Sequence, residues 1–137
     1  MHDNMKTDKN IRISPEYQER IIMVHEEVKN GNCSTLRECL ILFEKLWNYD
    51  YPENLLISNR AREKLEKLQK DDPKQYSNVI KKISQIQENP EHFKPLSGDL
   101  SGSRRVHIGD FVLIYSLVKD KIIILDYDHH KKIYLSN

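Results

Sequence analysis

Two residues of one short segment are suited to chemistry on a phosphodiester. Arg105 and His107 stand two positions apart within residues 103–108, where alternation with apolar residues predicts a strand. Because residues i and i+2 of a strand project from the same face, a fixed cation and an imidazole that titrates near neutral pH are expected side by side. Such a surface suits a negatively charged substrate better than an apolar ligand.

The strand that follows should decide which face these two residues share. Gly109-Asp110 is a signal for a two-residue turn, and a hairpin at this turn would place His107 opposite Val112 on the same face. Arg104 would then lie on the other face, as a rim or structural charge. A register shift of one residue would reverse both assignments.

Cleavage of RNA without a metal needs a base for the 2′-hydroxyl proton, an acid for the departing 5′-oxygen and a cation for the extra negative charge. The last third of the chain carries imidazoles, cations and a phenol that can supply these functions. The candidate catalytic residues are Arg105, His107, His130 and Tyr134. The candidate RNA-binding residues are Lys94, Arg104, His129, Lys131 and Lys132. Asp126 and Asp128 are either acid–base residues or hydrogen-bond partners that orient the imidazoles.

No metal site and no cofactor are predicted. His129 and His130 are adjacent, and neighbours on a strand point to opposite faces; no third ligand is evident near them. Cys33 and Cys39 have no cluster of His or Cys around them. We interpret them as unpaired thiols rather than as a disulfide or a metal site.

From about residue 51 to residue 134 the chain resembles the toxins of the RelE/ParE superfamily. Residues 93–115, FKPLSGDLSGSRRVHIGDFVLIY, are similar to the family pattern KPLxGDLxGxRRxxxGDYRxxY, and residues 128–134 resemble the family's terminal His-containing motif. The resemblance implies an α+β fold in which a curved antiparallel sheet packs with two helices. For the RelE branch it implies ribosome-dependent mRNA cleavage, and for the ParE branch gyrase inhibition without nuclease chemistry.

Two positions depart from the family pattern. Val112 stands where the family commonly has a functional Arg, and His129-His130 stands where many members have His-Arg. The spacing from His130 to Tyr134 matches that between the catalytic His and the terminal aromatic residue in some members. The resemblance therefore implies a catalytic role for His130.

The pattern of apolar residues and caps predicts two modules, residues 1–50 and 51–137. In the first, Ser14 and Pro15 favour a helix start and Gly31 favours a helix end. The expected elements there are a strand at 10–14 and helices at 16–29 and from 33 or 34 to 47. In the second module they are a strand at 53–57, helices at 59–70 and from 73 to about 88, and strands at 103–108, 111–118 and 121–127.

The strand–helix–helix order of residues 10–47 resembles a ribbon-helix-helix module. That resemblance implies that residues 10–14 pair with a second copy of the chain and enter the DNA major groove. Asn10, Arg12 and Ser14 would be the DNA-binding residues, and the chain would be a homodimer. The alternative is a helical hairpin that caps the C-terminal domain.

Charge and composition fit a globular protein that contacts nucleic acid with its C-terminal part. The net charge is +1; residues 1–50 carry seven basic and nine acidic residues, a net of −2, and residues 51–137 carry fifteen and twelve, a net of +3. Ordinary solvated surface would explain this difference equally well. No apolar run approaches a membrane span and no leader pattern opens the chain, so we expect a cytoplasmic protein.

Together these features predict a toxin of a type II toxin–antitoxin system that cleaves mRNA in the ribosome and binds a cognate antitoxin. Two alternatives come from a different class of function. One is a ParE-like gyrase inhibitor without nuclease chemistry. The other is a fused antitoxin–toxin whose N-terminal half binds operator DNA and masks the toxin surface.

Overall fold

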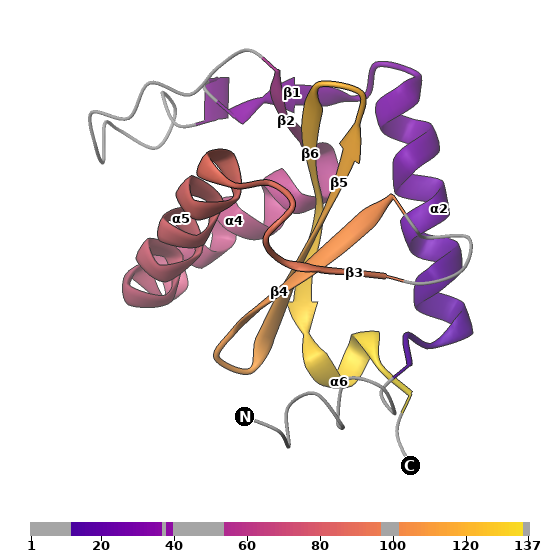
Figure 1. The fold of residues 1–137 in the computed structure, drawn as a ribbon. Coiled ribbons are helices and arrows are strands. Elements are labelled where there is room, and N and C mark those ends of the chain that lie inside the picture. The colour runs from indigo at the N-terminus through magenta and orange to yellow at the C-terminus, as the bar shows by residue number, and fades with distance from the viewer. Residues whose placement is uncertain (1–11, 37, 40–53, 97–101, 136–137) are drawn as a thin grey trace.

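The computed structural model describes residues 12–36, 38–39, 54–96 and 102–135. Within them the elements are α2 (Pro15–Lys29), β1 (Cys33–Thr35), β2 (Leu55–Ser58), α4 (Asn59–Asp71), α5 (Pro73–Glu88), β3 (Lys94–Pro95), β4 (Ser103–Ile108), β5 (Phe111–Val118), β6 (Lys121–His129) and α6 (His130–Ile133). The strands form one sheet in the order β1-β2-β6-β5-β4-β3 (Figure 1). Neighbouring strands are antiparallel except β2 and β6, which are parallel. The expected α+β class is confirmed, with one parallel pair added.

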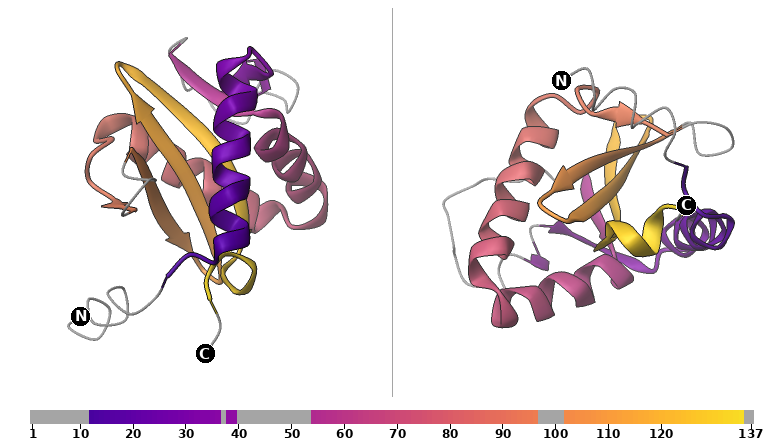
Figure 2. Two further views of the ribbon diagram at one scale, coloured as in Figure 1. Left: turned by 90° about the vertical axis from the view of Figure 1, so that its right-hand side faces the viewer. Right: turned by 90° about the horizontal axis from the view of Figure 1, so that it is seen from below.

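Helices cover both faces of this sheet. The face against α4 and α5, called the first face, contributes apolar residues of four strands, β2, β4, β5 and β6, to one core that includes Ile57, Leu113 and Ile124. The opposite face, called the second face, packs against α2 through Val112, Ile114, Ile123 and Leu125. Seen from below, the sheet lies between α4 and α5 on one side and α2 on the other (Figure 2).

The two helices on the first face begin where local caps place them. The Ser58 hydroxyl accepts a hydrogen bond from the Ala61 amide and donates one to the Leu125 carbonyl, so the start of α4 is tied to β6. Asp72 caps α5, and Pro73 occupies its first position. The apolar stripe predicted for α5 is buried; it consists of Tyr76, Val79, Ile80, Ile83 and Ile86.

The β4–β5 hairpin has the predicted bounds and register. Gly109 adopts a φ of 67°, in the left-handed region that a tight turn requires and glycine accepts readily. His107 lies opposite Val112, as expected. Val106 and Ile108 belong to the first-face core, so Arg105 and His107 project from the second face.

The end of β6 was not predicted correctly. A register shift between Ile114 and Tyr115 bends the pairing of β5 with β6, and β6 continues to His129 rather than ending at residue 127. A single helical turn, α6, follows it. The His130 amide bonds to the Asp110 carbonyl at 2.9 Å, so this turn is held against the β4–β5 hairpin.

The N-terminal helix forms as predicted, but the strand before it does not form the expected ribbon. Ser14 caps α2 by accepting a hydrogen bond from the Tyr17 amide. Ile13, however, forms a β-bridge with Tyr134 of the same chain, and the Leu135 amide bonds to the Arg12 carbonyl at 2.7 Å. The physical reason is burial: Ile13 is 8% exposed and belongs to the second-face core.

The start of the next helix also differs from the prediction. Residues 33–35 form β1, which pairs with β2. The Thr35 amide bonds to the Glu38 carboxylate and the Glu38 amide to the Thr35 hydroxyl, a capping box that begins a helix at Leu36 rather than at residue 33 or 34. The expected remainder of this helix, residues 40–47, lies outside the described residues. None of the helices in the described parts of the chain is both long and apolar enough to cross a membrane.

Candidate active site

Three of the four candidate catalytic residues lie together beside the second face. The His107 and Tyr134 rings are stacked, with centroids 5.9 Å apart and planes 20° apart. The Tyr134 hydroxyl lies 3.3 Å from Nε2 of His107, and the Arg105 guanidinium carbon lies 6.0 Å from the centroid of the Tyr134 ring. We call Arg105, His107 and Tyr134 the Tyr134 cluster. His107 is exposed, Arg105 is half-buried, and Tyr134 is 9% exposed.

Tyr134 reaches this place because the chain doubles back after β6. Its amide bonds to the His130 carbonyl at 3.0 Å, which closes the α6 turn, and its backbone forms the bridge with Ile13. The backbone of Tyr134 is therefore held by two segments at opposite ends of the described chain. The sequence alone does not indicate the second of these two contacts.

The position of Val112 in the structure explains why valine stands there in place of the arginine of the family pattern. It lies opposite His107, is fully buried, and belongs to the core between the sheet and α2. A guanidinium at this position would be a charge buried among apolar side chains. Burial of an unpaired ion destabilises the folded state by several kcal/mol, as an order of magnitude. Valine suits a second face that a helix covers.

Arg104 lies on the first face, as expected. Its Nη1 donates hydrogen bonds to the Phe93 carbonyl at 2.8 Å and to the Glu91 carbonyl at 3.3 Å. These bonds hold the segment after α5 against β4, which is a structural role. Lys94, on β3, pairs with Arg105 and is therefore next to the Tyr134 cluster.

The remaining imidazoles form a separate group at α6. The rings of His129 and His130 are stacked with centroids 4.5 Å apart, which differs from the expectation that they point to opposite faces. The reason is that the strand ends at His129 and the helical turn begins at His130. Nδ1 of His129 accepts a hydrogen bond from the Lys131 amide, so this imidazole caps α6. Lys131 and Lys132 are exposed.

The carboxylates of β6 do not orient the imidazoles in the contacts that the structure records. Asp126 is 1% exposed and accepts hydrogen bonds from Arg60 and Lys64 of α4 and from the Tyr17 hydroxyl of α2. Lys64 also binds Asp128 at 2.9 Å. Burial, and next the nearby Asp126 carboxylate, raise the pKa of the Tyr17 phenol, which stays protonated and donates.

Sequence reasoning missed this Asp126 network, although a signal was present. Two carboxylates in a strand that is otherwise buried must find cationic or hydrogen-bonding partners. Here the partners come from α4 and α2, which lie on opposite faces of the sheet. The network therefore joins α2 to the rest of the fold by a polar contact in addition to its apolar stripe.

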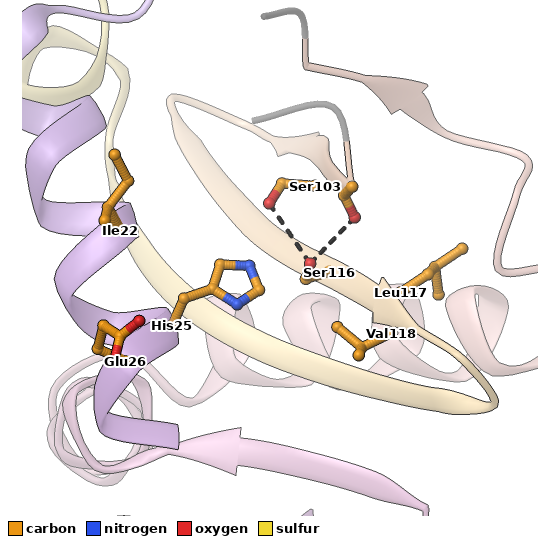
Figure 3. A pocket seen from close by; sticks show the side chains of 8 residues that line it. Ile22, His25, Glu26, Ser103, Ser116, Leu117 and Val118 are labelled. Carbon is orange, nitrogen blue, oxygen red and sulfur yellow. Dashed lines mark hydrogen bonds between the residues drawn. The ribbon is translucent and has the colours of Figure 1, made fainter. Parts of the chain in front are cut away.

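A cavity separates part of α2 from the sheet. It has a volume of about 290 Å³ and lies between His25 and Glu26 of α2 and the ends of β4 and β5 (Figure 3). The Ser116 hydroxyl bonds to the Gly102 carbonyl at 3.0 Å, and its oxygen lies 3.5 Å from that of Ser103. Burial lowers the pKa of His25. The close packing of α2 is thus interrupted at this place.

Two further predictions concern metal ligands and thiols. Cys33 is half-buried and Cys39 is buried, and both are free thiols. Within the part of the chain that the structure describes, no group of three His, Cys, Asp or Glu side chains could hold a metal ion.

Comparison with known proteins identifies the part of the chain that carries this site. Residues 55–134 match the family described as ParE toxin of type II toxin-antitoxin system, parDE. A protein of Methanocaldococcus jannaschii named "Putative toxin RelE4" is 40% identical over 73 residues, which are 51% of this chain and 78% of that protein.

Two solved structures show the same fold. The YoeB/ParE toxin from Agrobacterium tumefaciens has a TM-score of 0.51 at 17% identity, over 56% of this chain and 96% of its own. The YoeB dimer from Staphylococcus aureus has a TM-score of 0.50 at 23% identity, over 56% of this chain and 95% of its own.

The matched residues contain β2 to α6, and α2 and β1 precede them. The Tyr134 cluster and both first-face helices thus lie within the matched region, whereas the helix over the second face does not. The family match covers more than half of the chain and agrees with the fold and with the resemblance of residues 93–115. The chain belongs to the ParE toxin family, within the RelE/ParE superfamily, and is a toxin of a type II toxin–antitoxin system.

Proposed function

We propose that this toxin is an endoribonuclease that cleaves mRNA in the ribosome, with the Tyr134 cluster at its reactive centre. The single observation that carries the proposal is the convergence of Arg105, His107 and Tyr134. The imidazole can act as the base and the guanidinium as the cation that metal-free cleavage of a phosphodiester requires, and the phenol can position the imidazole.

Each member of the cluster has a distinct task in this proposal. His107 takes the proton of the 2′-hydroxyl, because its imidazole is exposed and can accept a proton. Arg105 stabilises the negative charge that develops on the phosphate. Tyr134 fixes the His107 ring through the 3.3 Å contact with Nε2 and offers a ring face for a base.

A second imidazole would protonate the departing 5′-oxygen. His130 is our candidate, because its carbonyl accepts the Tyr134 amide and the two residues therefore lie one helical turn apart. Its ring is stacked on that of His129. The ribosome would supply the rest of the catalysis by presenting the message in a reactive geometry.

Mapping the 5′ ends of translated messages after induction of the toxin tests the proposal. New ends within coding regions, absent when translation is blocked, are expected for the native chain and absent for His107→Ala. Lys67→Ala is the control, since the Lys67 side chain is 80% exposed on α4. Growth arrest with intact messages and double-strand DNA breaks would instead identify a gyrase inhibitor.

We propose as a second candidate that the N-terminal half masks the toxin domain, as in the fused antitoxin–toxin alternative. The observation that favours it is the position of α2, which lies outside the matched family region and covers the face that contains Val112. A helix from an antitoxin would require the same kind of apolar surface. The N-terminal half of this chain would then perform part of the role of the cognate antitoxin.

Operator binding by the N-terminal half stays a proposal. Arg12 is exposed, Ser14 is engaged as the cap of α2, and Asn10 lies outside the described residues. Gel-shift titration with the chain's own promoter tests it. Binding with a strong dependence on salt, weakened by Arg12→Ala, would support DNA contact, and an unchanged affinity would end it.

A further inference from the structure

A groove crosses the outer edge of β4 next to the Tyr134 cluster. It has a volume of about 220 Å³. One wall comes from Lys82 of α5 and from His92, Phe93 and Lys94 of the segment between α5 and β4. The other wall comes from Arg105, Val106 and His107 of β4. We call this the edge groove.

The edge groove exists because β3 is short. β3 pairs only with Arg104 and Arg105, so in the described part of the chain residues 106–108 of β4 have no strand neighbour on the outer side. The groove can therefore pass from α5, on the first face, round the edge of the sheet to Arg105 and His107 on the second face. It does not involve α2, so the cover on the second face leaves it accessible.

The lining of the edge groove is cationic and aromatic. Among the residues that the structure describes, it is lined by two lysines, one arginine, two histidines, one phenylalanine and one valine, and by no carboxylate side chain. The Lys82 ammonium lies 5.9 Å from the centroid of the Phe93 ring, and the His92 ring makes an edge contact with the same ring at 4.8 Å. Cations spaced along a groove with an aromatic face among them are the features that bind single-stranded nucleic acid.

We propose that the edge groove binds the ribose–phosphate backbone of single-stranded RNA next to the reactive phosphate, with Lys82, His92 and Lys94 on the phosphates and Phe93 against a base. The proposal rests on the proposed nuclease function for the choice of RNA. Lys82 and His92 lie outside the set of residues that sequence reasoning selected, and only the fold brings them to Arg105 and His107.

Fluorescence-anisotropy titration of the full chain with a short oligoribonucleotide tests this proposal directly. Every ribose of the probe carries a 2′-O-methyl group, which prevents cleavage and separates binding from catalysis. Lys82→Ala should lower the affinity several-fold and reduce the slope of log K against log salt by about 0.7, the value for one phosphate contact on a single strand. Lys82→Arg should restore most of both.

Lys81→Ala is the matched control, because Lys81 is exposed on the same helix and does not line the groove. It should leave the salt slope unchanged. Equal losses in Lys81→Ala and Lys82→Ala would overturn the proposal, since they would show a general charge effect. The proposal would also be overturned if duplex DNA or an acidic peptide displaced the probe at the same concentration as unlabelled single-stranded RNA.

The binding test and the cleavage test can fail separately. If messages stay intact in cells but Lys82→Ala still weakens binding of the probe, the edge groove stands and the nuclease proposal fails. If messages are cut and Lys82→Ala changes neither cutting nor binding, the nuclease proposal stands and the edge groove fails.

Discussion

The two faces of the sheet are both covered by helices, but the covers differ in origin. On the first face, α4 and α5 lie within the matched family region and share its core. On the second face, α2 precedes that region and covers Val112. Apolar burial thus has two different results. The helices α4 and α5 form the core of the toxin domain, whereas α2 removes one face of that domain from solvent.

The largest expected effect comes from the first face. Ile80→Ala removes a side chain that is 1% exposed in the core between α5 and the sheet. Loss of its transfer free energy and the resulting cavity should lower the free energy of unfolding by about 2–5 kcal/mol. Urea unfolding followed by circular dichroism measures it, and Ile22→Ala, at a position 46% exposed, should change it by less than about 0.5 kcal/mol.

A charge introduced on the second face should test whether α2 can be released without unfolding α4 and α5. Val24 is 3% exposed and packs from α2 onto the sheet, so Val24→Asp should release α2 while the first-face core remains folded. Hydrogen exchange should then accelerate in α2 but not in α5. Met23→Asp is the matched control at a position 60% exposed.

The same variant tests masking. If α2 restrains the toxin, Val24→Asp should arrest growth more strongly than the native chain, and Met23→Asp should not. Equal growth arrest in both variants and the native chain, with α2 released, would contradict masking. Global unfolding of Val24→Asp would show instead that the two faces form one cooperative unit.

The polar contact between α2 and Asp126 should have a smaller effect. Tyr17→Phe removes one donor from a buried carboxylate that keeps Arg60 and Lys64, so the free energy of unfolding should fall by about 1 kcal/mol. Urea unfolding of the two proteins at pH 7 measures the difference. A more stable Tyr17→Phe protein would contradict a stabilising role for this bond.

The Tyr17 contact also has a defined pH dependence. Because the folded state raises the pKa of Tyr17, its contribution is present below about pH 10, the ordinary value for tyrosine, and is lost as the pH rises above it. The difference in stability between the native chain and Tyr17→Phe should therefore shrink above pH 10. Tyr115 and Tyr127 also have raised pKa values, so the comparison with Tyr17→Phe isolates the phenol of interest.

The smallest effect on stability is expected at His107 of the Tyr134 cluster. His107 is exposed, and His107→Ala should change the free energy of unfolding by less than about 0.5 kcal/mol while abolishing growth arrest. Thermal unfolding and a growth assay on the same variant check both parts. Undiminished toxicity of His107→Ala and of Arg105→Ala would remove the catalytic assignment.

Much of the local structure follows from the sequence. The bounds of β4 and β5 and the pairing of His107 with Val112 were predicted, because the period of two and a turn at Gly109 are encoded within a dozen neighbouring residues. The start of α2 at Pro15 was predicted from its cap for the same reason. The family was recognised from residues 93–115, which match a pattern of contiguous positions.

Contacts between distant segments were decided by the tertiary structure. The apolar stripe of α2 predicts that the helix is buried, but any apolar surface of suitable shape satisfies that stripe, so the sequence does not say that it covers Val112. The sequence likewise does not predict the bridge from Ile13 to Tyr134. Nor does it predict that Asp126 binds Tyr17 and Lys64. Hydrophobic burial is not directional, and a carboxylate accepts any donor within reach; only the complete fold selects the partners.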